Sequence, residues 1–301
     1  MFVLGIDWGG TFIKIGLVKI SGKVNLLKKL VYASERLKEK ETFISKLISL
    51  IEEFKDYKIK GIGIGAPGII DTRKGFIYYL PNVKGWENFP LKEMLEGRLK
   101  IPVFVDNDAN LFALGEAKLG VGKEKKRIIF LTLGTGLGSS IIWEGKILEA
   151  GTSSLELAHV PVSLKGRKCG CGARGCIETF IGAKYLLRRY YQLKKERIKE
   201  VRELFQRGLK KEKEALIVWR EFSYSLGKFL AGMVNIFNPQ MIIIGGGVSG
   251  AFRLFKPLLL ETIKKEAMWP QLKNLKLVRA KLKNAAIFGA AIMVKERLKV
   301  E

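Results

Sequence analysis

Residues Val3–Val24 read VLGIDWGGTFIKIGLVKISGKV, which is a short apolar run, a glycine pair and a second run in which apolar residues recur. After Gly10 the apolar spacing is that of a β-strand, so the stretch predicts a strand, a glycine turn and a strand. A Rossmann unit would instead enter a helix after its glycines. The stretch therefore predicts a β-hairpin at the start of an α/β fold of another kind.

A second stretch has the same layout. Residues Ile128–Leu148 read IIFLTLGTGLGSSIIWEGKIL, and aligning the two Gly-Thr pairs places this copy roughly 124 residues after the first. Two copies of one supersecondary unit indicate an internal duplication. We expect two similar α/β lobes facing a cleft, where backbone N–H groups of both glycine turns meet a phosphate chain.

The rest of the chain alternates strands with helices. A helix is predicted at Lys38–Lys55, a buried strand at Lys60–Gly65, and a strand at Ile101–Asp106 that runs into a helix ending at Gly120. The last third is mainly helical. Its predicted elements are helices at Glu214–Phe237, Ala251–Lys265 and Ala285–Leu298, and strands at Met241–Ile244 and Leu275–Arg279.

The chain is strongly basic: 54 Lys and Arg residues against 29 Asp and Glu residues give a formal net charge of +25 in 301 residues. Such a charge suits a nucleic-acid partner, but it also suits solvated helices. The run Arg188–Ala215 mixes both signs at helical spacing, which predicts an amphipathic helix pair with a salt-bridged face. Either way, a positive field favours an anionic substrate such as a nucleoside triphosphate.

No signal peptide or membrane-spanning run is recognised in the sequence. The start MFVLGIDWGG lacks the basic residues and the longer apolar run of a secretory signal. No apolar stretch approaches the ~18 residues of a membrane span. We expect a soluble, cytoplasmic protein that makes no membrane contact.

Every cysteine and the only histidine lie in HVPVSLKGRKCGCGARGCIE, His159–Glu178. Cys169, Cys171 and Cys176 together with His159 form a Cys₃His set, which is typical of zinc. A disulfide would leave one thiol over, and a thioredoxin-type site needs C-x-x-C. Because four protein ligands leave no open coordination position, we predict a structural zinc ion rather than a catalytic one.

Two further patterns point to phosphate chemistry. Asp7 precedes the turn of Gly9, Gly10 and Thr11, and a carboxylate beside a glycine hairpin suits a Mg²⁺–phosphate complex. Asn107–Asp108 lies where a strand enters a helix, so Asp108 should stay ionised and can accept a proton from an attacking hydroxyl. Plain helix capping explains this pair equally well from its position alone.

The loop IIIGGGVSG matches G-x-G-x-x-G at Gly245, Gly247 and Gly250. The dinucleotide fingerprint also needs an acidic residue about 20 positions on at the end of a second strand, which this sequence lacks. We therefore expect a nucleotide-facing loop of another kind. No Walker A lysine motif occurs in the chain.

Together these pieces resemble the ROK family of sugar kinases and sugar-responsive repressors, over nearly the whole chain. The resemblance is carried by DWGGTFIK, GAPG, VDNDAN, LTLGTGLGSS, LELAH with CGCGARGCIE, and NPQMIIIGGGVSG. It implies a two-lobed actin/hexokinase-like (ribonuclease H-like) α/β fold with internal duplication. It also implies a homodimeric hexose kinase that acts in carbohydrate phosphorylation and glycolysis. The smaller lobe is expected at 1–117 with 285–301, and the larger at 118–284.

The resemblance also assigns roles to residues. Asp108 is similar to the catalytic base that takes the proton of the sugar 6-hydroxyl, and His159 would bind both zinc and a sugar hydroxyl. The implied sugar-binding residues are Gly68, Asn82, Asn107, Asp108, Glu156, His159 and Glu178. The implied residues for ATP and Mg²⁺ are Asp7, Gly9, Gly10, Thr11, Lys14, Gly134, Thr135, Gly136, Gly246 and Gly247. The implied zinc ligands are His159, Cys169, Cys171 and Cys176.

Two departures from the family pattern affect these expectations. Ala158 replaces the glycine of the usual E-x-G-H, which leaves the preferred sugar open. Phe12 replaces the lysine usual after GGT, and Lys14 follows two places on. Glucose, N-acetylglucosamine, N-acetylmannosamine, mannose, fructose and allose stay open as substrates, and ATP, ADP or polyphosphate as donor.

The alternative from another class is a sugar-responsive transcriptional regulator. Such relatives carry a DNA-binding winged helix before the kinase-like body, and here the first phosphate strand begins at Val3. We therefore expect no specific nucleic-acid partner, with hexose and ATP as the ligands.

Overall fold

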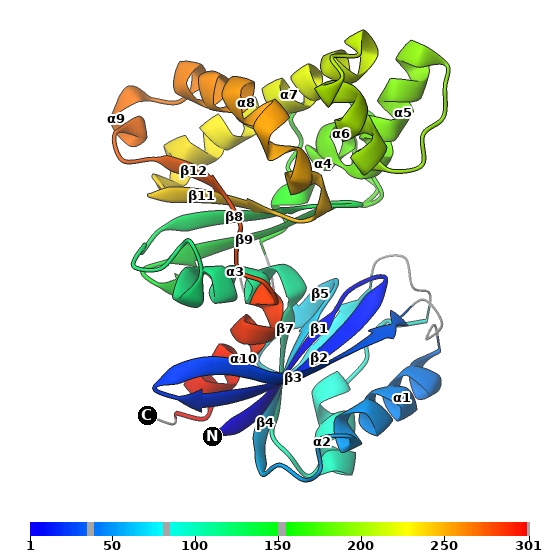
Figure 1. Ribbon diagram of the computed structural model, residues 1–301, viewed down its shortest axis with the longest axis vertical. Coiled ribbons are helices and arrows are strands. Elements are labelled where there is room, and N and C mark those ends of the chain that lie inside the picture. Colours follow the sequence, from blue (N-terminus) through cyan, green and yellow to red (C-terminus); the bar gives the residue numbers. More distant parts are fainter. Residues whose placement is uncertain (35–38, 81–84, 150–154, 300–301) are drawn as a thin grey trace. The chain divides into compact units, whose positions relative to one another are not determined.

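The computed structural model describes residues 1–34, 39–80, 85–149 and 155–299 (Figure 1). Within them are two five-stranded sheets of matching order, β3-β2-β1-β4-β7 and β10-β9-β8-β11-β12. In the first sheet, β4 pairs parallel to β1 and β7 pairs parallel to β4. In the second sheet, β11 pairs parallel to β8 and β12 pairs parallel to β11. The α/β class and the internal duplication predicted from the two glycine turns are confirmed.

The strands predicted from the apolar runs are present, and further strands occur beside them. Those of the first sheet are β1 (Phe2–Trp8), β2 (Phe12–Ser21), β3 (Lys23–Ala33), β4 (Ile59–Ala66) and β7 (Val103–Asn107). Those of the second are β8 (Ile128–Leu133), β9 (Leu137–Trp143), β10 (Lys146–Ile147), β11 (Met241–Gly245) and β12 (Lys276–Arg279). A small sheet pairs β5 (Ile69–Asp71) with β6 (Phe76–Tyr79).

The chain divides into two compact units. The first comprises Met1–Glu124, Ser140–Leu155 and Lys281–Glu301, and the second comprises Lys125–Ser139 and Glu156–Ala280. The lobe boundaries expected at 117/118 and 284/285 from the sequence stay predictions.

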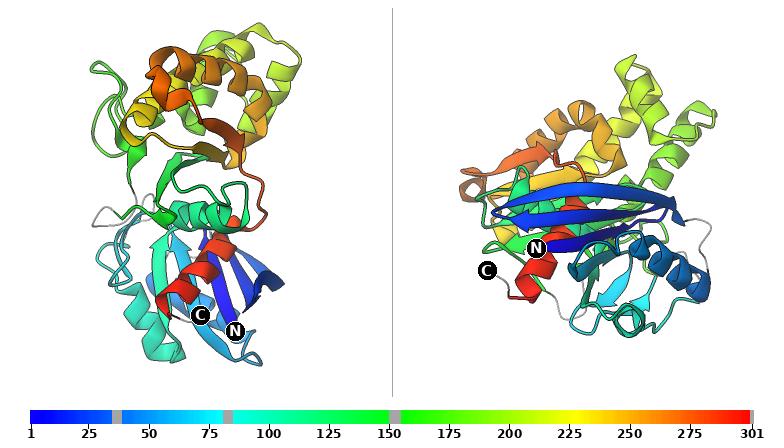
Figure 2. Two further views of the ribbon diagram at one scale, coloured as in Figure 1. Left: turned by 90° about the vertical axis from the view of Figure 1, so that its left-hand side faces the viewer. Right: turned by 60° about the horizontal axis from the view of Figure 1, so that its bottom comes forward.

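In the first unit, helices cover both faces of the sheet (Figures 1 and 2). On one face, α1 (Lys40–Glu52) and α2 (Leu91–Leu99) join the main core with Leu4 and Ile6. On the other, α10 (Ala285–Arg297) packs on Val3 and Val18 and against α3 (Asp108–Leu119). The helix predicted at Lys38–Lys55 begins at Lys40 among the described residues, and Lys38 lies outside them.

Glycines set how closely α10 approaches its sheet. A Cβ added at Gly5 would lie 2.2 Å from the carbonyl oxygen of Ile287, and one at Gly63 would lie 2.4 Å from that of Ala290. Both distances are far below a normal contact, so any side chain here would push the helix away from β1 and β4. Helix α10 therefore packs directly on the first sheet.

In the second unit, α7 (Lys213–Phe237) packs against α8 (Phe252–Glu266), and both lie over one face of the second sheet (Figure 1). The other helices here are α4 (Glu178–Ile181), α5 (Ala183–Lys194), α6 (Val201–Leu209) and α9 (Trp269–Leu272), with short 3₁₀ segments η2 (Leu157–His159) and η3 (Gly247–Ala251).

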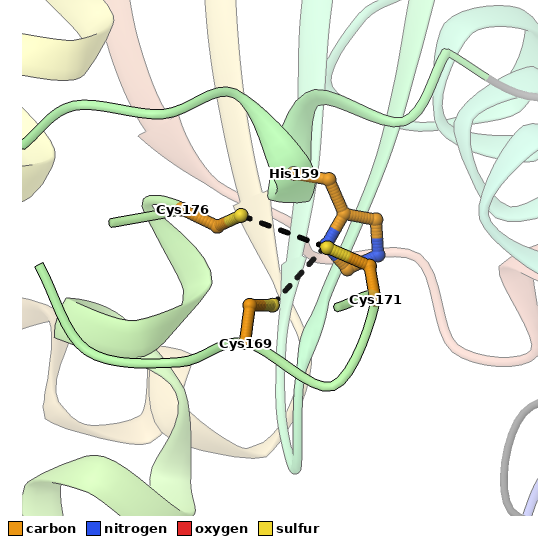
Figure 3. Close-up of side chains that lie close together, drawn as sticks. All are labelled: His159, Cys169, Cys171 and Cys176. Carbon is orange, nitrogen blue, oxygen red and sulfur yellow. Dashed lines mark hydrogen bonds between the residues drawn. The ribbon is translucent and has the colours of Figure 1, made fainter. Parts of the chain in front are cut away.

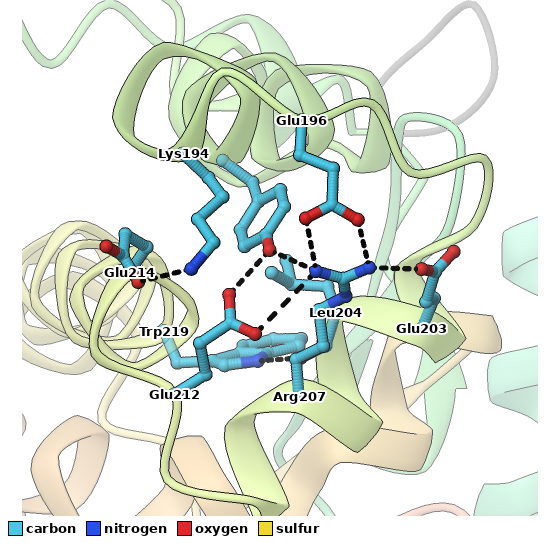
Figure 4. Close-up of polar contacts among 9 residues, drawn as sticks. Lys194, Glu196, Glu203, Leu204, Arg207, Glu212, Glu214 and Trp219 are labelled. Carbon is cyan, nitrogen blue, oxygen red and sulfur yellow. Dashed lines mark hydrogen bonds and ion pairs between the residues drawn. The ribbon is translucent and has the colours of Figure 1, made fainter.

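The basic run predicted as an amphipathic helix pair covers the end of α5, all of α6 and the start of α7. Its charges form a network around Arg207, whose guanidinium donates to Glu196 at 2.6 and 2.9 Å and to Glu203 at 2.8 Å (Figure 4). Arg207 also donates to the hydroxyl of Tyr190 at 2.6 Å. The salt-bridged face predicted for this run is confirmed.

Among the described residues, no helix has both the length and the apolar character that crossing a membrane requires.

Candidate active site and metal centre

The first glycine turn joins β1 to β2. Gly9 N–H donates to the Phe12 carbonyl at 2.9 Å, and the Ser34 hydroxyl donates to the Gly9 carbonyl at 2.9 Å. Asp7 and Lys14 are opposite each other in the antiparallel register, and Lys14 Nζ lies 2.7 Å from Asp7 Oδ2. This edge of the sheet therefore presents a paired carboxylate and ammonium.

The exposed Gly10 and Thr11 form the tip of this turn. Thr11 also accepts a hydrogen bond at its carbonyl from Ser34 N–H at 2.9 Å. Ser34 thus supports the turn twice, and nothing in its sequence context indicated that role.

Parallel strands bring the predicted base to the same edge as Asp7. The register places Asp7 opposite Gly65 of β4, and Gly65 opposite Asp106 of β7. A Cβ at Gly65 would lie 3.3 Å from the Cα of Asp108, so the end of β4 lies closely against the start of α3. Asp108 itself is half-buried as the first residue of α3, where the helix dipole favours a negative charge.

Asn107 caps α3 as its sequence position predicted. Its Oδ1 accepts from Ala109 N–H at 2.9 Å, and its Nδ2 donates to the Gly68 carbonyl at 3.1 Å. Gly68 has a φ of 92°, a left-handed conformation that favours glycine. Asn107 and Gly68 thus lie together. Asn82 lies outside the described residues.

Asp106 is a buried carboxyl that sequence reasoning did not single out. Its Oδ1 accepts from Asn107 N–H at 2.6 Å and from Asn110 Nδ2 at 2.8 Å. Burial raises the pKa of Asp106 to about 6, although these hydrogen bonds oppose the shift. Its only signal in the sequence is an acidic residue at the end of a buried strand.

The Cys₃His group is assembled in the second unit (Figure 3). One ligand atom from each of His159, Cys169, Cys171 and Cys176 lies within 4.8 Å of the others. His159 Nδ1 is 3.5 Å from Cys169 Sγ, and Cys171 Sγ is 3.7 Å from Cys176 Sγ. Ligands at ordinary zinc distances in a tetrahedron would be separated by about 3.5–3.8 Å. These four residues fit a metal ion.

Burial, followed by hydrogen bonds from Cys171 and Cys169, raises the pKa of Cys176 to about 12. A buried thiol of this kind becomes a thiolate readily only when a cation replaces its proton. Because Nδ1 of His159 faces the sulfur atoms, Nε2 is the nitrogen directed away from them.

The second glycine turn joins β8 to β9 and is contacted by Glu178, the first residue of α4. Glu178 Oε2 accepts from Leu137 N–H at 3.1 Å, and Oε1 is 4.0 Å from Cys169 Sγ. Ala183 N–H donates to the Gly134 carbonyl at 3.0 Å. Two predicted groups, Glu178 and the turn of Gly134, Thr135 and Gly136, are thus in contact. Glu156 is exposed and precedes η2.

The glycine loop after β11 begins at Gly246, whose φ is 81°. A Cβ at Gly246 would lie 2.4 Å from the carbonyl oxygen of Leu133. Gly246 therefore packs against the end of β8, and Gly247 opens the 3₁₀ segment η3. This loop follows the strand that pairs with β8, at the edge of the sheet that also carries the second glycine turn.

Comparison with protein families gives a match to the ROK family model over residues 3–297. The chain belongs to the ROK family. Its ROK relatives include a glucokinase of Thermotoga maritima, 34% identical over 98% of each chain. They also include a xylose repressor of Caldicellulosiruptor bescii, 34% identical over 97% of this chain and 77% of the repressor.

A solved ROK structure agrees with this fold. The glucokinase of Streptomyces griseus in complex with glucose and AMPPNP is 27% identical, with a TM-score of 0.84 over 98% of this chain and 100% of that one. The actin/hexokinase-like fold expected from the resemblance is confirmed. Because the family includes both glucokinases and repressors, membership alone does not assign an activity.

Proposed function

We propose that this protein is a hexose kinase that transfers the γ-phosphoryl group of ATP to the 6-hydroxyl of glucose or a related hexose. The observation that carries the proposal is Asp108, half-buried at the N-terminus of α3 on the sheet edge that also presents Asp7. A carboxylate at a helix N-terminus, on the sheet edge that carries the predicted phosphate-binding turn, is the group that a sugar kinase needs as its base.

In the proposed reaction, Asp108 accepts the proton of the 6-hydroxyl as the sugar oxygen bonds to the γ-phosphorus. The bond from that phosphorus to the bridging β–γ oxygen breaks, and ADP leaves with the electron pair. Asp108 then carries one proton, which it returns to water. Asn107 and Gly68, next to it, are proposed as sugar-binding groups. Asn82, which lies outside the described residues, is proposed as a third.

In the second unit, Glu156, His159 and Glu178 are the proposed sugar-binding side chains. The ring of His159 supports a double role, since Nδ1 faces the sulfur atoms and Nε2 is left for a sugar hydroxyl. Ala158, fully buried beside it, is proposed to influence which hexose is accepted.

Both glycine turns are proposed to bind the nucleotide. Asp7, Gly9, Gly10, Thr11 and Lys14 form the first group, and Gly134, Thr135, Gly136, Gly246 and Gly247 form the second. Mg²⁺ bound with ATP would neutralise charge on the phosphates. Lys14 would pair with a phosphate oxygen, and Asp7 keeps Lys14 in place through their 2.7 Å contact.

The metal proposed for the Cys₃His group is zinc, held by His159, Cys169, Cys171 and Cys176 in a structural role. Three sulfur ligands and one nitrogen ligand are a zinc set, and the measured separations of 3.5 and 3.7 Å suit a tetrahedron. A homodimer stays a prediction from the family resemblance, and a cytoplasmic location stays a prediction from the sequence.

The test is a coupled assay that measures ADP release with ATP, Mg²⁺ and a panel of hexoses. We expect turnover with glucose or a close relative, and a 6-phosphate product by NMR. If turnover is highest with N-acetylglucosamine, N-acetylmannosamine or fructose, the protein is still a sugar kinase, but that sugar replaces glucose as its proposed substrate. ADP and polyphosphate replace ATP in parallel reactions, in which NMR of the sugar phosphate identifies the donor. No phosphorylation of any sugar with any donor would refute the proposal.

A second candidate is a sugar-responsive regulator, which the repressor relative at 34% identity favours. Its prediction is retention on DNA that depends on sequence and is altered by sugar, in a protein without kinase activity. The net charge of +25 makes salt the essential control, because nonspecific phosphate contacts fall steeply with ionic strength.

A further inference from the structure

The turn between β8 and β9 is supported from a distant part of the sequence. Within it, Gly134 N–H donates to the Gly136 carbonyl at 3.0 Å. The start of α5 reaches the same turn, because Ala183 N–H donates to the Gly134 carbonyl at 3.0 Å. The segment after the cysteines therefore determines where this turn lies.

The second support is a carboxylate. Oε2 of the half-buried Glu178 accepts from Leu137 N–H at 3.1 Å, while Oε1 points toward Cys169, 4.0 Å from its sulfur. With Oε2 engaged by the turn, Oε1, whose contact with Cys169 Sγ is long at 4.0 Å, is the oxygen that can accept from a ligand hydroxyl. One side chain therefore contacts both the predicted phosphate turn and a predicted zinc ligand.

The two glycines of the turn differ in what surrounds them. A Cβ at Gly136 would lie 2.4 Å from Glu178 Oε2 and 3.3 Å from its carboxyl carbon. A Cβ at Gly134 would meet no atom of the described residues within 4 Å. Neither glycine has a left-handed φ, so backbone strain does not explain the need for glycine. Gly136 leaves the room that the Glu178 carboxylate occupies.

We propose that Glu178 couples sugar binding to the phosphate-facing turn and that Gly136 is a positioning residue for the sugar. This rests on the function proposed above. A hydroxyl that donates to Oε1 orients the carboxylate, and Oε2 then holds Leu137 N–H and the turn in place for the phosphates. By linkage, sugar raises nucleotide affinity and nucleotide raises sugar affinity by the same factor.

The matched pair Gly136→Ala and Gly134→Ala tests this inference. Sugar affinity is measured by calorimetry without nucleotide, using the hexose with the highest turnover in the panel. Gly136→Ala should weaken sugar binding by about tenfold or more, because the new methyl group displaces a charged hydrogen-bonding group. In Gly134→Ala, the sugar affinity without nucleotide should stay within about twofold of that of the wild type. Equal effects of the two substitutions, or no effect of Gly136→Ala, would overturn the inference.

A double-mutant cycle with Glu178→Ala gives a second test. Gly136→Ala and Glu178→Ala should each weaken nucleotide binding, because each frees the turn from the carboxylate. Once the carboxylate is absent, Gly136→Ala has nothing to displace, so it should weaken nucleotide binding no further in that background. Metal content is measured for each variant, so that loss of the metal is separated from loss of the contact. Additive effects in variants of normal metal content would contradict the coupling.

A readout without sugar separates this inference from the proposed function. Hydrogen exchange at Leu137 N–H should accelerate in Glu178→Ala, while the first turn at Gly9–Phe12 exchanges as in the wild type. If the wild type binds no sugar, the proposed function fails and the exchange experiment still decides whether Glu178 holds the turn. If the wild type binds sugar and exchange at Leu137 is unchanged, the coupling alone fails.

Discussion

The two sheets share one topology but carry opposite chemistry at matching positions. In the first sheet, one row across the parallel strands reads Asp7, Gly65, Asp106. The row at the equivalent place in the second sheet reads Leu131, Ile244, Arg279. The duplication therefore kept the backbone pairing, while of these two rows only the one in the first sheet carries carboxylates, Asp7 and Asp106.

The turns beside these rows differ in their support as well. An ion pair between neighbouring strands, Asp7 with Lys14, lies beside the first turn. The second turn depends on Glu178 and Ala183, from a segment that also carries the predicted metal ligands. Substitutions near the first turn should therefore change turnover and nucleotide binding. Substitutions near the second turn should change metal content and stability.

The largest expected effect is that of Asp108→Asn in the first copy. Removing a general base should lower kcat by about 10²–10⁴-fold, while sugar binding stays close to normal. Steady-state kinetics together with calorimetry measure both. Near-normal turnover would show that the acidic edge of the first sheet does not supply the base.

The next effect is metal removal, which should act on the second copy. A metal present at about a hundred- to thousandfold above its Kd adds about 3–4 kcal/mol to the free energy of unfolding. Cys169→Ser or chelation should remove that stability and the bound metal together. Asp7→Asn, in the first copy, should leave metal content unchanged. Elemental analysis measures the bound metal, and denaturant unfolding measures the free energy of unfolding. A metal-free protein of full stability would contradict a structural role.

The buried carboxyl of the first row predicts a pH dependence. Because the pKa of Asp106 is raised from 3.8 to about 6, the folded protein keeps this proton over a range in which the unfolded chain loses it. This contribution to stability is complete below pH 4 and is lost as pH rises through 6. Its size is on the order of 3 kcal/mol.

Asp106→Asn removes the titrating group and keeps an acceptor for Asn107 N–H and Asn110. We expect the difference between the unfolding free energies of wild type and variant to change between pH 4 and pH 6.5, with the wild type losing stability relative to the variant as pH rises. Parallel curves over that range would exclude a raised pKa.

The smallest expected effect on stability is that of Lys14→Ala. The two side chains of the Asp7–Lys14 pair are 19% and 39% exposed, so its loss should cost less than about 1 kcal/mol of unfolding free energy. The KM for ATP should nevertheless rise. In the control Lys23→Ala, an exposed lysine of β3, the KM for ATP should stay as in the wild type. An unchanged KM would separate this ion pair from nucleotide binding.

The sequence by itself predicted much of the fold, because strand period and glycine turns are local signals. The repeated turn indicated the duplication, and α3 begins after Asn107 and ends at Gly120, as its predicted caps require. The Cys₃His group was also readable, since its members lie within eighteen consecutive residues, His159 to Cys176.

Only the tertiary structure decided which distant groups meet. Asp106 became a buried carboxyl because α3 and its neighbouring strands enclose it, and Glu178 reached the second turn across 41 positions of sequence. Periodicity and spacing describe a residue's own segment. Burial, pKa shifts and contacts between segments arise only when the sheets and helices pack. For that reason the sequence predicted Gly136 as a nucleotide-binding glycine but not its contact with Glu178.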